Sequence, residues 1–138
     1  MRGGNKMKFT VYAEPVAKGR PRFSGYHAYT PKKTRDYEKL VRDSYIQECG
    51  ETFLEGEIRA NIICYFPIPK STSKKNRALM ERGDIRHTKR SDCDNLAKTI
   101  LDALNGIAYK DDCQVCELHV YKFYSSEPRT EVILSSKE

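Results

Sequence analysis

Four segments of the chain alternate hydrophobic and polar residues with the period of two that is typical of β-strands. They cover residues 8–12, 57–67, 115–124 and 130–134. The last two segments are separated only by residues 125–128, which contain two serines and a proline. Because such residues favour turns, we expect the last two strands to form a hairpin.

Two longer segments place their apolar residues at helical spacing instead. The first begins at Thr30, a residue suited to capping, followed by Pro31 at the first helical position, and it ends at Gly50. Its apolar positions are Tyr37, Leu40, Val41 and Tyr45. The second segment covers residues 91–105 and ends at Gly106.

The order of these elements predicts one α+β domain, in which a small mixed β-sheet is packed by two main helices. A chain of 138 residues has the usual size of a single domain, and we assign residues 1–138 to it. Residues 1–6 precede the first predicted strand and are expected to be disordered. Residues 70–90 are polar and basic, and we expect a loop region there with a short helix over residues 74–82.

The distribution of charge indicates what kind of partner this domain has. The formal net charge is +6, but residues 1–35 carry +8 and residues 70–90 carry +6, so the remainder of the chain carries −8. Clustered Lys and Arg side chains displace counterions from phosphates, and a nucleic acid is therefore the expected partner. The alternative is a pair of solvated basic loops that bind nothing.

Composition argues against several other classes of protein. The longest apolar stretch, residues 60–69, is far shorter than the ~20 residues that span a bilayer. No basic stretch followed by an apolar segment opens the chain, as it would in a signal peptide. Five cysteines at irregular spacing favour reduced thiols over a disulfide framework. We therefore expect a cytoplasmic protein that does not bind membranes.

The second predicted helix carries a polar face opposite its packing face. At 100° per residue, one face holds the apolar residues Leu96, Ile100, Ala103 and Leu104. The opposite face holds Asp94, Lys98, Asp102 and Asn105. Asp92 lies at the start of the helix, where free backbone amides favour an acid. Asp111 and Asp112 follow the helix, and because adjacent extended residues point in opposite directions, we expect only one of them to join the other acids.

Carboxylates that meet at one point repel each other unless a hard cation lies between them. Mg²⁺ is commonly held by one or two carboxylates, several waters and substrate phosphate oxygens. Such an ion acidifies a bound water and neutralises charge that develops on a phosphoryl oxygen. Acids next to basic segments therefore suit phosphodiester hydrolysis. The alternative is an ordinary N-cap at Asp92 and an ion pair between Asp94 and Lys98 worth about 0.2–0.5 kcal/mol.

Three motifs are recognisable together: Asp92-Cys-Asp-Asn-Leu-Ala-Lys98, Asp102-Ala-Leu104 and Asp111-Asp-Cys-Gln-Val115. They resemble the signature of the RusA family of Holliday junction resolvases, which are common in phages and prophages. Residues 18–23 and 29–33 resemble the N-terminal region of members from Gram-positive bacteria and phages. The resemblance implies a homodimer of a small α+β fold that binds four-way DNA junctions. It also implies symmetric nicks in two strands of like polarity, with Mg²⁺ or Mn²⁺ and no organic cofactor, in DNA recombination and repair.

The resemblance assigns residues to this activity. The catalytic residues that it implies are Asp92, Asp94, Lys98 and Asp112. The three acids among them are the expected metal ligands, and Asp111 and Asn95 are expected to support them. The basic residues expected to contact DNA are Lys18, Arg20, Arg22, Lys32, Lys33, Lys74, Lys75, Arg77, Lys89 and Arg90.

Three other functions are compatible with parts of the sequence. A nuclease specific for flaps or other branched DNA would need the same residues, because sequence does not report which branched structure is bound. A non-catalytic junction-binding protein would use its acids structurally. A glycosyl- or nucleotidyltransferase could use Asp-x-Asp to grip a metal-bound nucleotide, but it would leave the two basic segments unexplained.

Overall fold

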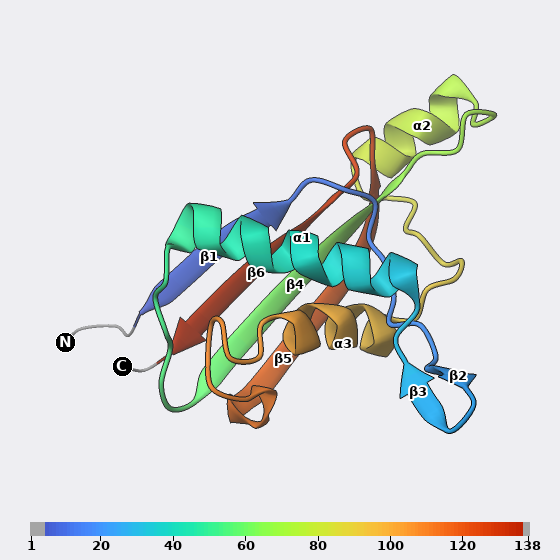
Figure 1. Ribbon diagram of the computed structural model, residues 1–138. Helices are drawn as coiled ribbons and strands as arrows, with labels where there is room; N and C mark the ends of the chain where they lie inside the picture. Colours follow the sequence, from blue (N-terminus) through green and yellow to red (C-terminus); the bar gives the residue numbers. More distant parts are fainter. Residues whose placement is uncertain (1–4, 137–138) are drawn as a thin grey trace.

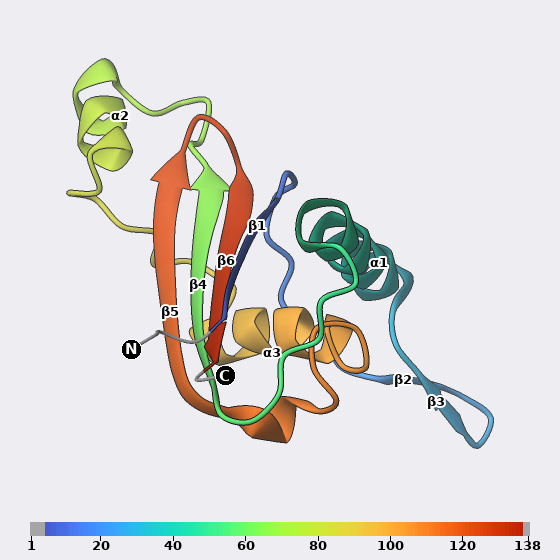
Figure 2. The same ribbon diagram turned by 90° about the vertical axis from the view of Figure 1, so that its left-hand side faces the viewer.

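The computed structural model describes residues 5–136, and it shows one layer of β-sheet with two helices on one face (Figures 1 and 2). The elements are β1 (Lys6–Val11), β2 (Arg22–Ser24), β3 (His27–Tyr29), α1 (Lys32–Cys49), β4 (Ile58–Pro67), α2 (Lys74–Glu81), α3 (Cys93–Ala103), the 3₁₀ turn η1 (Asp112–Gln114), β5 (Val115–Ser125) and β6 (Arg129–Ser136). The predicted α+β domain with a mixed sheet and two main packing helices is confirmed. Residues 1–4 of the segment expected to be disordered lie outside the described residues, and Lys6 begins β1.

The central strand of the sheet is β4, and its position corrects one prediction. The strand order is β1-β6-β4-β5, with β4 parallel to β5 and antiparallel to β6. The prediction that β5 and β6 form a hairpin with each other is therefore wrong, because β4 lies between them. The residues of β4 that face the helices are all buried: Ile58, Ala60, Ile62, Cys64 and Phe66. A strand with so apolar a face is most stable in the middle of the sheet, where helices cover it and both of its edges are paired.

Helix α1 packs on the sheet through a narrow stripe of residues. Tyr37, Val41 and Tyr45 are buried, and the ring of Tyr45 meets that of Phe9 in β1 edge-on at 5.4 Å. Leu40 was expected in this stripe but is 38% exposed, because it lies 100° around the helix from Val41 and misses the sheet.

The sequence predicted the C-terminal end of α1 correctly but not the N-terminal cap. Gly50 ends the helix as predicted, with φ +71. Thr30 was expected to cap the first turn, but the N-cap position is Pro31 and no side chain caps it. The Thr30 carbonyl instead accepts a hydrogen bond from Arg35 Nε at 3.1 Å.

Helix α3 lies beside α1 on the same face of the sheet (Figure 2). Its predicted packing residues are all buried: Leu96, Ile100, Ala103 and Leu104. The buried Tyr109, from the loop that follows, donates its hydroxyl to the Leu101 carbonyl at 2.7 Å. The polar face of α3 is thereby held toward solvent, which fixes where the acids of the predicted site lie.

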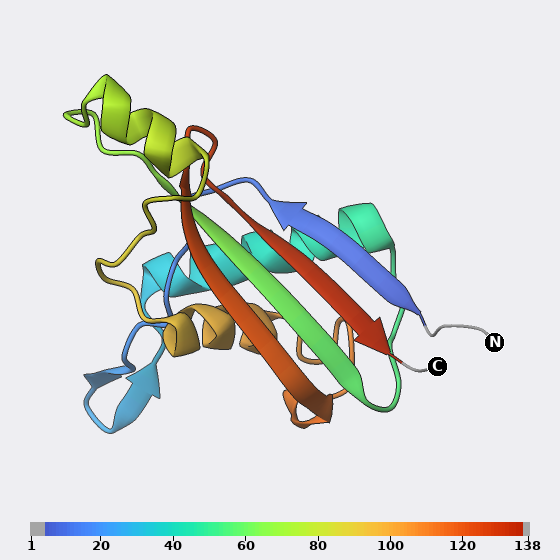
Figure 3. The same cartoon turned by 180° about the vertical axis from the view of Figure 1, so that it is seen from behind.

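Two segments project from this body. The short helix α2 stands beyond the ends of β4 and β5 (Figures 1 and 3), and it confirms the helix expected within the basic region 70–90. The hairpin of β2 and β3 stands out near the start of α1 and forms a sheet of its own. The sequence had predicted only a loop there, because three-residue strands are too short to show an alternating pattern.

All five cysteines are free thiols. Within residues 5–136, no helix combines the length and the apolar character that crossing a membrane would require.

Candidate functional site

Two acids lie at the N-terminus of α3. Asp92 is the N-cap residue in an extended conformation, but its carboxylate makes no capping hydrogen bond. Asp94 lies in the first turn, and its Oδ1 accepts the backbone N–H of Asn95 at 3.0 Å. Both residues are exposed. Their carboxylates are therefore accessible to a ligand from solvent, close to the positive end of the helix dipole.

The predicted third acid, Asp112, lies near the opposite end of α3. Its backbone N–H donates to Asn105 Oδ1 at 2.8 Å, which holds it beside the last turn of the helix. Burial raises the pKa of Asp112, and the charges of Asp111 and Asp102 and a hydrogen bond with Asp102 raise it further. The partner of Asp112 in this structure is therefore Asp102, an acid to which the sequence assigned no role in the site.

Asp111 has a role in shaping the turn that carries Asp112. Its carboxylate accepts the Cys113 N–H at 2.9 Å, and Gln114 Oε1 accepts the Asp111 N–H at 3.2 Å, so the two residues form a capping box. Hydrogen bonds from Cys113 lower the pKa of Asp111. This capping box holds the 3₁₀ turn η1, in which the backbone is not extended as the opposite-faces argument assumed.

In the part of the chain that the structure describes, Asp92, Asp94 and Asp112 do not meet in one metal site. Across residues 5–136, no three His, Cys, Asp or Glu side chains are arranged to hold a metal ion. Asp94 and Asp102 are eight residues apart, which is about 12 Å along the axis of a helix. The acids therefore form two groups at the two ends of α3. Their carboxylate oxygens fit Mg²⁺ by donor chemistry, because that ion commonly uses only one or two carboxylates together with phosphate oxygens and water.

Lys18 connects the N-terminal loop with both helices. Its Nζ lies 2.6 Å from Glu38 Oε2 on α1 and 3.2 Å from Asp102 Oδ2 on α3. Its backbone N–H donates to the Asn95 carbonyl at 2.9 Å. Burial lowers the pKa of Lys18, but Glu38 and Asp102 outweigh that effect, and the pKa is raised overall.

The structure thus places Lys18, expected to contact DNA, inside an ion-pair network rather than at the free end of a basic loop. Lys98 lies at the edge of this network, with Nζ 3.9 Å from Asp102 Oδ2, whereas the sequence had suggested an ion pair with Asp94. The sequence did not identify Glu38 as part of the site, because nothing in the helical pattern of α1 indicates that it faces Lys18. Asp102 could be found, since it shares the polar face with Asp94 and Lys98.

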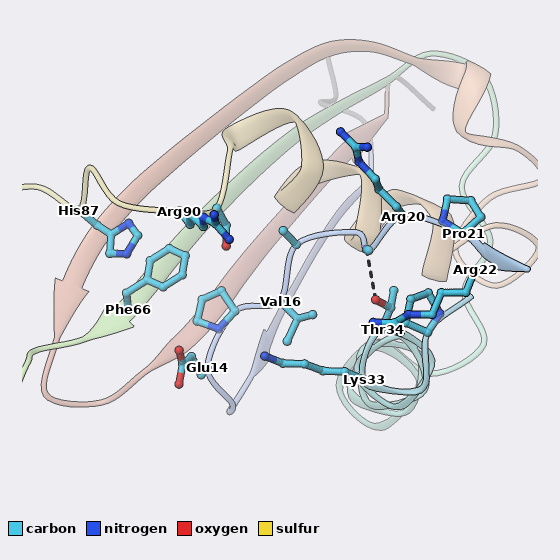
Figure 4. Close-up of a pocket in the computed structure, with 15 residues that line it drawn as sticks. Glu14, Val16, Arg20, Pro21, Arg22, Lys33, Thr34, Phe66, His87 and Arg90 are labelled. Carbon is cyan, nitrogen blue, oxygen red and sulfur yellow. Dashed lines mark hydrogen bonds between the residues drawn. The ribbon is translucent and has the colours of Figure 1, made fainter. Parts of the chain in front are cut away.

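A groove of about 600 Å³ runs between the N-terminal loop, the start of α1 and the loop before α3. We call it the basic groove, because four of its lining side chains are Arg20, Arg22, Lys33 and Arg90. In Figure 4, Arg90 and the rings of Phe66 and His87 lie toward one end, and Arg20 and Arg22 lie toward the other. The lining includes Ser91, the residue before Asp92. The lining of the basic groove therefore reaches the residue before the N-cap of α3, where the first group of acids lies.

The aromatic end of the basic groove holds His87 in a neutral state. Its ring stacks on Phe66 at 3.8 Å and 12°, and it meets Tyr124 edge-on at 5.2 Å. Burial, with the nearby charges of Lys122 and Lys89, lowers the pKa of His87 to about 4. At neutral pH this ring contributes shape and stacking to the groove, and the positive charge comes from the Arg and Lys side chains.

The remaining basic residues predicted to contact DNA lie outside the groove. Lys32 is exposed and pairs with Asp36 at 2.7 Å. The residues Lys74, Lys75 and Arg77 lie on the projecting helix α2. Lys89 is exposed in the loop that leads to α3, and its carbonyl accepts a hydrogen bond from Lys122 Nζ at 2.8 Å.

Comparison with known proteins gives two matches. A protein-family model described as endodeoxyribonuclease RusA matches residues 13–135. The uncharacterized protein YqaN of Bacillus subtilis (strain 168) is 44% identical over 134 residues, which cover 93% of this chain and 94% of that protein. The family match contains the basic groove and both groups of acids, and it confirms the resemblance predicted from the three motifs.

The Lys18 network predicts an effect on stability. Replacing Lys18 with Met leaves the half-buried Glu38 and Asp102 carboxylates without their cation, so we expect the free energy of unfolding to fall by about 1–3 kcal/mol. Lys39→Met removes an exposed ion pair with Asp43 and should cost less than about 0.5 kcal/mol. Urea unfolding of the two variants checks this. Equal effects would contradict the role of Lys18 in holding the three segments together.

His87 predicts part of the pH dependence of stability. Because its pKa is lowered from 6.5 to about 4 in the folded chain, the unfolded chain binds a proton that the folded chain excludes as pH falls through this window. The free energy of unfolding should therefore fall from pH 6.5 to pH 4. The ring is only partly buried, so we expect a contribution of about 1–2 kcal/mol. Urea unfolding at both pH values should show a smaller loss for His87→Asn than for the wild type, and equal losses would refute the assignment.

Proposed function

The chain belongs to the RusA family of endodeoxyribonucleases, and from this we propose that it resolves four-way DNA junctions by paired, symmetric, Mg²⁺-dependent nicks. The observation that carries the proposal is that the lining of the basic groove includes Ser91, the residue before Asp92, which together with Asp94 forms the accessible acid pair. A phosphodiester backbone bound along the groove would reach these acids. The same arrangement would be difficult to explain in a protein that only binds DNA.

The basic groove supplies the attraction for DNA. Guanidinium and ammonium groups that neutralise phosphates release condensed counterions, which gives sequence-independent affinity. Arg20, Arg22 and Arg90 can in addition bind phosphate oxygens through two N–H groups at once. The exposed Lys32 and Lys89, and the basic residues of α2, extend this attraction beyond the groove. Sequence-independent contacts suit an enzyme that recognises the shape of a branched substrate.

The acids supply the chemistry in this proposal. We assign Asp92 and Asp94 as metal-binding residues, because their carboxylates are accessible and Asp92 is not used for capping. Asp112 is assigned as the third acid; it lies beside Asp102 at the other end of α3, where a cation would neutralise two neighbouring carboxylates. Mg²⁺, or Mn²⁺ in its place, would be held by these two groups of acids, and it would supply an acidified water and a counter-charge for the phosphoryl oxygen.

Three other residues act on the substrate or on the acids. The ammonium group of Lys98, on the same helix face as Asp94, stabilises negative charge as it develops on the scissile phosphate. Asn95 supports the first group of acids, since its backbone N–H donates to Asp94 Oδ1 and its carbonyl accepts the backbone N–H of Lys18. Asp111 supports Asp112 through its capping box.

Paired nicks require two active sites. A domain of this size has room for one, so we propose that the protein acts as a homodimer in which a two-fold axis relates two identical sites. The symmetry of the dimer would then match that of a four-way junction. A nuclease that cuts flaps or other branched DNA uses the same residues, and the choice of substrate distinguishes the two.

The first test is a cleavage assay on a synthetic four-way junction, a flap, a Y-structure and a linear duplex, each with Mg²⁺, Mn²⁺ or EDTA. We expect symmetric paired cuts in the junction with either ion, and none with EDTA. The variants Asp92→Asn, Asp94→Asn and Asp112→Asn should bind the junction and cut it at least about 100-fold more slowly. Asp43→Asn, an exposed acid on α1, is the matched control and should retain full activity.

Each outcome of this assay has a defined meaning. Full activity in an Asp112→Asn variant would remove Asp112 from the site, and full activity in all three would overturn the site. Preferred cutting of the flap would show that the substrate is a flap and not a four-way junction. Junction binding without cleavage under any metal condition would leave a non-catalytic binding protein.

The basic groove is tested separately by the salt dependence of binding. Arg20→Gln and Arg90→Gln should each weaken binding to junction and duplex alike, and each should reduce the slope of log K against log[salt] by about 1. Lys39→Gln, on the exposed side of α1, should leave both quantities unchanged. Unchanged slopes in the two arginine variants would rule out the groove as the surface that contacts phosphates.

A further inference from the structure

The hairpin of β2 and β3 exposes an unusual number of aromatic side chains. Of the nine large hydrophobic side chains exposed among the described residues, three lie within the eight residues of the hairpin, Arg22–Tyr29. Phe23 is 72% exposed, Tyr29 is 47% exposed and Tyr26, at the tip, is fully exposed. Aromatic side chains are usually buried in a core or an interface, because their rings are costly to hydrate. These rings are therefore available to a ligand.

The hairpin has a defined conformation and a fixed base. Its strands pair in register from Arg22 with Tyr29 to Ser24 with His27, and the two-residue turn between them places Gly25 at φ +64. Such a turn requires a positive φ, which glycine adopts without strain. At the base, the Gly19 N–H donates to Thr34 Oγ1 at 3.2 Å. The tip is thus held out from the body in one direction (Figures 1 and 2).

The charge around the hairpin limits the partners that it can bind. Residues 15–35 carry six Lys or Arg side chains and no acid. Two arginines that line the basic groove lie at the base of the hairpin. Arg22 begins β2, and Arg20 lies two residues before it. A second copy of the same hairpin would be repelled by this charge. Exposed rings combined with basic side chains are instead the combination that binds unpaired nucleotides, in which the bases stack and the phosphates are neutralised.

This inference rests on the proposed function. We propose that the hairpin recognises the branch point itself, because the ring of Tyr26 stacks on a nucleobase that is unstacked at the centre of the junction. Phe23 provides a second ring on one face of the hairpin, and Arg22 shares the other face with Tyr29. A linear duplex offers no unstacked base, so this contact contributes affinity only for branched DNA. The basic groove binds any phosphate backbone, and the hairpin adds the preference for a branch.

The test measures binding in EDTA, so that cleavage does not interfere, to a four-way junction and to a linear duplex of one of its arms. Tyr26→Ala should weaken junction binding by about 5- to 150-fold, the range expected for loss of one base–aromatic stack, and should change duplex binding less than twofold. Tyr26→Phe keeps the ring and should bind as the wild type does. Tyr12→Ala removes another exposed tyrosine, which is 75% exposed just after β1, and should leave both affinities unchanged.

A second measurement places the contact on the base. 2-Aminopurine at the branch point reports stacking by its fluorescence, and we expect saturating wild-type protein to change it and saturating Tyr26→Ala to leave it as in free DNA. The inference is overturned if Tyr26→Ala retains the junction preference, or if it weakens junction and duplex binding equally. It is also overturned if the variant changes only the oligomeric state in sedimentation, which would place the hairpin at a protein interface.

The proposed function fails in a different way. If the wild type binds the junction no more tightly than the duplex, the junction is not its substrate. If the wild type prefers and cuts the junction while Tyr26→Ala does the same, only the inference about the hairpin is lost.

Discussion

The ammonium group of Lys18 holds together the three segments on which the candidate site depends. It bridges Glu38 on α1 and Asp102 on α3, and the backbone of the same residue is hydrogen-bonded to Asn95. This interaction fixes the N-terminal loop against α3, and so it fixes the basic groove next to Asp92. The hairpin of β2 and β3 begins four residues later and takes its direction from the same base.

The acids of the candidate site lie in two groups at the two ends of α3. Asp92 and Asp94 lie at its start, and Asp102 and Asp112 lie near its end. The N-terminal group is compensated by the helix dipole, and the C-terminal group by Lys18 and Lys98 around Asp102. Burial and the neighbouring charges of Asp111 and Asp102 raise the pKa of Asp112. This separation leaves the accessible pair, Asp92 and Asp94, at the end of α3 that meets the groove.

Hydrophobic periodicity predicted an element reliably where one face of that element is buried and the other faces solvent. The alternation in β4 and the helical spacing of Leu96 and Ile100 predicted both the elements and their core faces, because burial imposes these periods directly. The same patterns failed for partners in space. They paired β5 with β6, whereas β4 lies between the two, and a period of two carries no information about which strand is the neighbour. They also missed β2 and β3, because all six residues of these strands are exposed, so buried and exposed positions do not alternate along them.

The sequence by itself determined the family, the α+β class, the residues of the acidic motifs and the basic character of the segments around them. These properties reside in residue identity and short-range spacing, which need no knowledge of the fold. Only the tertiary structure decided that Lys18 is held by Glu38 and Asp102, that Asp112 lies against Asp102, and that four basic residues from separate segments line one groove. Those contacts join residues far apart in the chain, and they form because packing of α1 and α3 on one face of the sheet brings their polar sides together.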